Sequence, residues 1–248
     1  MKHGEYDVMA QVETEHWWYR TLHHLVAAEL TRYTRRASLR VMADAGCGTG
    51  GLYVALRNRL SSVDYVGIDV ERSALAHCRR RGARKLVCGS VNDLPLGPGV
   101  VDAIVPLDVL YFSTIDRRRA LRQLRATLRP GGILVLNLPA FEALRGRHDE
   151  AVGIERRFRR KEVESLLDEA GFRDIKTTYW NLMLFVPLLA WRWLSRLGSD
   201  EQVRSDLTLP FRWVNRLLIV PLRLEAAVAL RWGLPFGSSV LAVARRAD

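Results

Sequence analysis

The spacing of apolar positions changes along the chain from a helical period to a strand period. Residues 13–36 are predicted to form an amphipathic helix, whose apolar positions at helical spacing are Trp18, Leu22, Leu25, Val26 and Leu30. From residue 39 onward, short apolar runs alternate with arginine-rich amphipathic segments. We interpret as strands the runs 39–44, 63–70, 85–90, 100–108, 131–139, 172–180 and 238–246. Helices are expected at 50–60, 71–81, 117–128 and 160–170.

This alternation of strands and helices predicts an α/β fold, because a parallel strand pair needs a right-handed crossover, usually a helix. The pattern divides the chain into four parts. They are an N-terminal helical cap at 1–38, a core at 39–180, an apolar helical insertion at 181–237 and the last strand of the core at 238–248.

The insertion is predicted to contain two very apolar helices, at 181–198 and about 211–232. The longest apolar run, Leu182 to Trp191, is about half a bilayer span, so no transmembrane helix is expected. The second helix interleaves arginine with leucine, valine and tryptophan, a pattern typical of helices at a membrane interface. Two alternatives carry equal weight: a helical pair that closes over the active site, and a homodimer interface.

The net charge of +11 and the isoelectric point of about 10.2 favour anionic partners, such as nucleic acid, acidic lipid surfaces or phosphorylated substrates. The equally weighted alternative is a generally arginine-rich composition, because the arginines are spread over most predicted helices. The three cysteines have no zinc-ligand spacing, and no metal site is expected. The N-terminus is also too polar for a signal peptide. We therefore expect a cytoplasmic protein, which could bind peripherally to the inner face of the membrane.

A glycine-rich loop follows the first predicted strand, in the segment DAGCGTGG at 44–51. Gly46, Gly48 and Gly51 fit the dinucleotide pattern GxGxxG, in which main-chain N–H groups approach a phosphate. Asp44 argues against a pyrophosphate, because its carboxylate would repel it, and favours a ligand with an ammonium and a sulfonium. Asp69 ends the second strand, where an acid accepts hydrogen bonds from ribose hydroxyls.

Five segments in this order, DAGCGTG, GID, CGSVNDLPL, VVDAIVPLDVLYF and LRPGGILVLNLP, resemble the class I S-adenosylmethionine-dependent methyltransferases over about residues 39–180. The resemblance implies a Rossmann-like sheet of seven mostly parallel strands with helices on both faces. It also implies S-adenosylmethionine as cofactor, with the glycine loop at its methionine part, Asp69 at its ribose and the segment from Ser90 at its adenine. Many members have an acid where this chain has Ser90. The expected cofactor residues are Tyr19, Arg20, Asp44, Gly46, Cys47, Gly48, Gly50, Asp69, Val70, Ser90, Val91, Asn92 and Leu107.

Catalytic residues are less clearly indicated, because methyl transfer mainly requires alignment and desolvation of the nucleophile. Many family members carry a Glu-His pair where this chain has Tyr111-Phe112. His148 is therefore a candidate base, with Asp149 orienting it, and Tyr111 could orient a substrate hydroxyl. The alternatives are a surface loop for the first two and core packing for Tyr111. Expected substrate contacts are Trp18, Asp108, Phe112 and Arg157.

The segment HWWYR at 16–20 is expected to form an aromatic lid over the cofactor, with Arg20 at the cofactor carboxylate; the alternative is packing on the sheet edge. Together with residues 147–172 and the segment YWNLMLF, it resembles a bacterial subgroup associated with glycan, lipid or secondary-metabolite pathways. We therefore expect methylation, on oxygen or carbon, of a small amphipathic or apolar acceptor such as a lipid-linked, polyprenyl or secondary-metabolite molecule. Nucleic-acid methylation is an alternative prompted by charge, but no (D/N)PP(Y/F) segment follows the fourth strand. A non-methylating or interaction role of the same fold is a third possibility.

Overall fold

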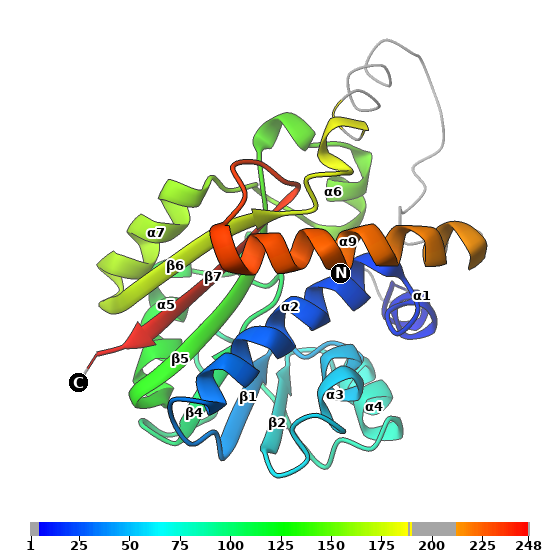
Figure 1. Ribbon diagram of the computed structural model, residues 1–248. Helices are drawn as coiled ribbons and strands as arrows, with labels where there is room; N and C mark the ends of the chain where they lie inside the picture. Colours follow the sequence, from blue (N-terminus) through cyan, green and yellow to red (C-terminus); the bar gives the residue numbers. More distant parts are fainter. Residues whose placement is uncertain (1–4, 188, 190–211, 248) are drawn as a thin grey trace.

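The computed structural model describes residues 5–187, 189 and 212–247, which form an α/β fold around one seven-stranded sheet (Figure 1). The strand order is β3-β2-β1-β4-β5-β7-β6, and only the pairings that involve β7 are antiparallel. The strands are β1 (Val41–Ala45), β2 (Asp64–Asp69), β3 (Lys85–Cys88), β4 (Val101–Val105), β5 (Leu128–Pro139), β6 (Phe172–Trp180) and β7 (Ser239–Arg246). The Rossmann-like fold class expected from the sequence is confirmed.

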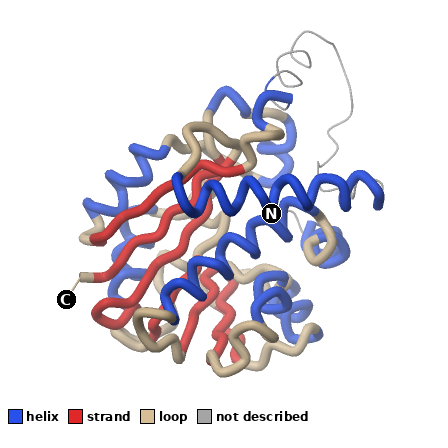
Figure 2. The backbone as a smooth tube through the Cα atoms, viewed as in Figure 1, coloured by secondary structure: helices blue, strands red, loops and turns tan. Residues whose placement is uncertain are grey.

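Successive residues of the central strands point into two different apolar layers, as a strand period of two requires. In β4, Ile104 packs with α5 (Arg117–Thr127) and α7 (Arg160–Glu169), whereas Ala103 and Val105 pack with α2 (Trp17–Thr34) and α3 (Gly51–Leu56). The remaining core helix, α4 (Arg72–Arg80), packs against β2 and β3. The tube view in Figure 2 shows the sheet enclosed by helices. Both faces of the central strands β1, β4 and β5 are therefore buried, which explains why these strands are mostly apolar.

The N-terminal region differs from the single helix expected at 13–36. A separate helix, α1 (Glu5–Val12), comes first, and α2 starts only at Trp17. His16 has extended backbone geometry, and its ring nitrogen accepts a hydrogen bond from the Trp18 N–H, so it caps α2. The predicted helix start was wrong because the apolar spacing continues across a cap that only side-chain hydrogen bonding reveals.

The segment between β6 and β7 contains α9 (Arg212–Trp232), close to the helix expected at about 211–232. Most of the helix expected at 181–198 lies outside the described residues. No helix in the described part of the chain is long and apolar enough to cross a membrane. α9 lies along α2 on the outside of the molecule (Figure 1).

Two short elements complete the fold, a 3-10 helix η1 (Glu142–Leu144) and α6 (Arg147–Val152), both between β5 and α7. β5 starts three residues earlier than expected, because Leu128 already pairs with Val101 before the register shifts at the bulge. Residues 128–130, from the end of the expected helix to the start of the expected strand, therefore belong to the bulged strand.

Candidate active site

The glycine-rich loop lies between β1 and α3, at the point where the order of parallel strands reverses between β1 and β4. Gly46, Gly48 and Gly50 have φ values of +92°, +51° and +90°, which strain any residue with a Cβ. A Cβ at position 46 would also lie 2.2 Å from Cγ2 of Val109. The main chain here is consequently held in a tight cradle at the carboxyl end of the sheet, where open α/β folds bind ligands.

Two buried carboxyl groups flank this loop. The Asp44 side chain accepts a hydrogen bond from the Tyr65 hydroxyl at 2.6 Å, and burial raises its pKa to about 7. The Asp69 carboxylate accepts from the Gly48 N–H at 2.8 Å and from the Glu71 N–H at 2.9 Å, and burial raises its pKa as well. The Tyr65 hydrogen bond and the raised pKa of Asp44 both weaken the repulsion that this carboxyl group would exert on a pyrophosphate. Asp69 is the acid that contacts the loop itself.

The residues expected near the adenine follow β2 and β3. They comprise apolar Val70 and Val91 and a polar turn that starts at Ser90. Val70 is 63% exposed, although it directly follows a buried strand, while Val91 is buried. The Ser90 Oγ accepts from the Asn92 N–H at 3.2 Å. The Asn92 side chain donates to the Thr114 carbonyl and accepts from the Asp116 N–H, so it holds a neighbouring loop. Of the two polar side chains, Ser90 is thus the better placed to face a ligand.

The residues that cover the glycine loop come from α1, a helix that the apolar spacing does not reveal, and from Glu13 just after it. A Cβ at position 48 would lie 3.1 Å from Cε of Met9. The buried Glu13 carboxylate accepts hydrogen bonds from the Thr49 hydroxyl and from Arg81. Burial and the charge of Asp69 raise the pKa of the Tyr6 phenol, which places Tyr6 near the acid at the loop. The cap over the loop is therefore residues 6–13.

This cap is fastened to α4 rather than to the sheet. His77 Nε2 lies 2.7 Å from Asp7 Oδ1, and Arg81 Nη2 donates to the Ala10 carbonyl at 2.6 Å. Arg81 also pairs with Glu13. Since α4 starts at Arg72, shortly after Asp69, the cap rests on the helix that follows this acid.

The expected aromatic lid at 16–20 is placed differently. Trp18 packs against the fully buried Trp180 of β6, with ring centroids 5.5 Å apart, and joins the core layer beneath α2. Tyr19 is half-buried beside Trp18, and Arg20 is exposed. The placement of Trp18 matches the alternative of packing against the sheet.

A chain of hydrogen bonds runs from Trp180 to the end of β4. Trp180 Nε1 donates to Asn137 Oδ1 at 2.8 Å, and Asn137 Nδ2 lies 3.0 Å from both carboxylate oxygens of Asp108. Asp108 has φ +56°, an uncommon conformation that often marks functional sites. Burial raises its pKa to about 7, with the Asn137 hydrogen bond and the charge of Arg157 opposing. Asn137 and Trp180 were missed from the sequence because each looks like an ordinary strand residue.

Tyr111 and Phe112 follow Asp108, and their rings contact each other at a tilted angle of 47°, with centroids 4.4 Å apart. Tyr111 is buried, and this burial together with Asp108 raises the pKa of its phenol. Tyr111 is consequently neutral, so it can orient a substrate oxygen by a hydrogen bond but cannot remove a proton. Phe112 faces Gly153, where a Cβ would lie 3.5 Å from its ring.

Asp149 and Arg157 form a buried, bidentate ion pair. Arg157 Nε and Nη2 each lie 2.7 Å from a carboxylate oxygen of Asp149, and Nη1 donates to the Ala140 carbonyl at 3.1 Å. Both oxygens of Asp149 thus accept from Arg157, which differs from the expected Asp149–His148 pair and from a substrate role for Arg157. His148 belongs to α6, but its side chain lies outside the described residues, so its role stays a prediction.

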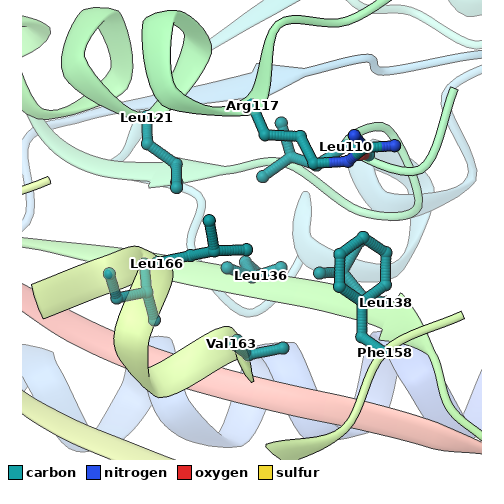
Figure 3. Close-up of a pocket in the computed structure, with 9 residues that line it drawn as sticks. Leu110, Arg117, Leu121, Leu136, Leu138, Phe158, Val163 and Leu166 are labelled. Atoms are coloured by element: carbon teal, nitrogen blue, oxygen red, sulfur yellow. The ribbon is translucent and has the colours of Figure 1, made fainter. Parts of the chain in front are cut away.

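A small internal cavity, drawn in Figure 3, lies between β5 and the helices α5 and α7. Its volume is about 10 Å³, and its lining is apolar apart from Arg117, which bonds to the Leu110 carbonyl. This is room for about one water molecule, so the cavity is a packing defect and not a substrate site.

Residues 43–136 match the family model described as "Methyltransferase domain". The matched segment contains the glycine loop, Asp69, Ser90 and Asp108. Over this segment the chain is similar to methyltransferases.

The chain is also similar to parts of curated proteins. The malonyl-[acyl-carrier protein] O-methyltransferase of Dechloromonas aromatica is 33% identical over 100 residues, which cover 38% of this chain and 35% of that protein. The O-methyltransferase cnsE of Penicillium expansum is 29% identical over 119 residues, which cover 42% of each chain. The chain thus spans about a third to two fifths of the length of these relatives.

Solved structures share the fold over most of the chain. A methyltransferase from Thermotoga maritima, titled a possible histamine N-methyltransferase, aligns with 98% of this chain and 95% of its own, at 19% identity and a TM-score of 0.61. A Haemonchus contortus phosphoethanolamine N-methyltransferase, solved with S-adenosylmethionine, aligns with 93% of this chain and 53% of its own, at 16% identity and a TM-score of 0.57. At these identities the likeness concerns the fold alone.

Proposed function

We propose that this chain is an S-adenosylmethionine-dependent methyltransferase that acts on oxygen or carbon of a small amphipathic or apolar acceptor. The observation that carries the proposal is the juxtaposition, at the carboxyl ends of β1, β2 and β4, of the glycine cradle, Asp69 and the half-buried Asp108. Two curated relatives named O-methyltransferases support the reaction class.

The residues present fit the cofactor chemically. Asp69 offers carboxylate oxygens for ribose hydroxyls, and the strained glycines leave the main chain of the loop without Cβ atoms toward a ligand. The exposed Val70 offers an apolar surface for the adenine, and Ser90 a polar one. When bound, S-adenosylmethionine supplies a methyl group on a sulfonium. Tyr6, Met9 and Glu13 of the cap would then exclude water from that end of the site.

Asp108 is the proton acceptor that this geometry favours. Its carboxyl group is held by Asn137, and a pKa of about 7 matches a base working near neutral pH. The neutral Tyr111 phenol, six residues beyond the end of β4, would orient the acceptor oxygen. His148 remains the second candidate for the base.

An aromatic cluster at the end of β5 supports an apolar acceptor. Phe141, which has φ +56°, stacks on Tyr179 with centroids 4.8 Å apart and meets Phe185 at 5.3 Å. Phe185 in turn stacks on Phe236, which is 52% exposed. Because Phe141 comes two residues after β5, the strand that carries Asn137, we assign this cluster to the acceptor side of the site. A lipid-linked, polyprenyl or polyketide-like molecule suits such a surface better than a free sugar.

Methyl-labelled S-adenosylmethionine, incubated with the protein and with separate lipid and polar-metabolite extracts, tests this proposal. We expect label in an organic-extractable product from the lipid extract, because burial of the acceptor's apolar part on the aromatic cluster is favourable. Phe236→Ser, at the exposed edge of the cluster, should raise KM for that acceptor more than it lowers kcat. Efficient methylation of a small, fully polar acceptor, with no lipid product, would contradict the acceptor class. Absence of any labelled product would contradict methyl transfer itself.

A further inference from the structure

The outer face of α9 carries a continuous row of exposed apolar side chains. They are Trp213, Leu217, Val220, Leu224, Val228 and Trp232, and all but Val228 are 64–73% exposed. Steps of three and four residues keep them on one side of the helix. From first to last they extend over about 28 Å at 1.5 Å per residue. We call this row the α9 stripe.

The opposite face of α9 is packed into the molecule, so the stripe is the side that the described residues leave exposed. Ile219, Leu222, Ala226 and Ala229 are buried on this inner face, beside α2. Asn215 accepts from the Trp17 N–H at 2.8 Å and donates to the Glu15 carbonyl at 2.7 Å. α9 is therefore rigidly attached to the junction between α1 and α2, next to the cap over the glycine loop. Figure 1 shows the helix on the outside of the fold.

The charges along the stripe are all of one sign. Arg216, Arg223 and Arg231 are exposed between the apolar residues. No ion pair joins Arg216 or Arg223 to an acid within the described part of the chain. Glu225, the one acid in the α9 sequence, is buried and accepts from the Leu182 and Met183 N–H groups. The outer face thus presents apolar and cationic groups together.

We infer that the α9 stripe docks the protein on an anionic membrane surface. Leucine and valine side chains would enter the acyl boundary, the arginines would reach lipid phosphates, and Trp213 and Trp232 would lie at the interface, which tryptophan prefers. A second copy of the chain fits less well, because a two-fold contact through this face would bring arginines together without a facing acid. Docking would place the acceptor side of the protein beside the lipid. Membrane binding itself does not depend on the proposed methyl transfer.

Flotation of the full chain with vesicles tests this inference, with phosphatidylcholine alone compared with phosphatidylcholine plus phosphatidylglycerol. We expect flotation only with the anionic vesicles and a loss of binding at high salt. Arg216→Gln with Arg223→Gln should lower the partition coefficient about thirtyfold, since each surface arginine contributes about fivefold. Leu217→Gln with Leu224→Gln should lower it at least tenfold, through lost burial of two leucines.

The matched control is Arg79→Gln with Arg80→Gln, which removes the same charge from exposed positions on α4. It should leave flotation within about threefold of the unaltered protein, because a specific face and not the net charge drives binding. Circular dichroism and thermal melting of each variant establish that it folds. Equal losses in the α4 and α9 arginine variants would overturn the inference. So would absence of flotation, or a dimer in analytical ultracentrifugation that Leu217→Gln with Leu224→Gln converts to monomer.

Discussion

Asp108→Asn is expected to lower kcat for methyl transfer by about 10²- to 10⁴-fold, the range that a general base contributes. Asparagine has nearly the same shape and tolerates a positive φ, so the backbone at +56° should persist. Cofactor binding should stay close to that of the unaltered protein. The measurement is single-turnover transfer of labelled methyl to the acceptor identified by extract profiling.

The dependence of kcat/KM on pH tests the same assignment of Asp108 independently. A base works when deprotonated, so kcat/KM of the unaltered protein should rise with pH through about 7, the raised pKa of Asp108. This rise should vanish in Asp108→Asn. His148→Ala serves as the comparison variant. If His148→Ala loses turnover and the pH rise while Asp108→Asn keeps both, His148 is the base and our assignment is wrong.

Arg157→Met is expected to lower the free energy of unfolding by about 3–5 kcal/mol, because it leaves the Asp149 carboxylate buried without a partner. The double variant Arg157→Met with Asp149→Leu should recover most of this loss, since no charge then remains buried. Urea denaturation followed by circular dichroism measures both.

The exposed pair Arg173–Asp168 provides the control, because solvent screens it on both sides. Arg173→Met should change the free energy of unfolding by less than about 1 kcal/mol. Equal effects at Arg157 and Arg173 would mean that the buried pair contributes no more than a surface one. A double variant as unstable as Arg157→Met would show that side-chain packing, and not the lone charge, explains the loss.

The sheet was predictable from the sequence because its signal is local and repeated. Each strand buried on both faces is a short apolar run, and each glycine with positive φ in the loop after β1 marks a turn that other residues avoid. The sequence therefore predicted that the glycine loop, Asp69, Ser90 and Asp108 lie at the carboxyl ends of successive parallel strands. Strand ends differ from the expected positions by at most three residues, as at β5, where a bulge determines the start.

The contacts between distant segments were not predictable in the same way. The glycine loop is covered by Met9 of α1 and by Glu13 just after it, but the sequence of α1 has neither a strong apolar period nor a cap signal. Likewise, nothing in the local sequence distinguishes the Asp149–Arg157 pair from an Asp149–His148 pair. Only the tertiary fold brings the Arg157 side chain back onto α6.

The central claim, that the domain binds S-adenosylmethionine at Asp69, is tested most directly by titration calorimetry of the full chain. We predict binding of S-adenosylmethionine and S-adenosylhomocysteine and no binding of NAD. Asp69→Ala should weaken both by about 1.5–3 kcal/mol, through loss of a charge-assisted hydrogen bond to the ribose. Asp64→Ala, at the exposed start of the same strand, should leave affinity unchanged. Binding of NAD, no binding of S-adenosylmethionine, or unchanged affinity in Asp69→Ala would contradict the account.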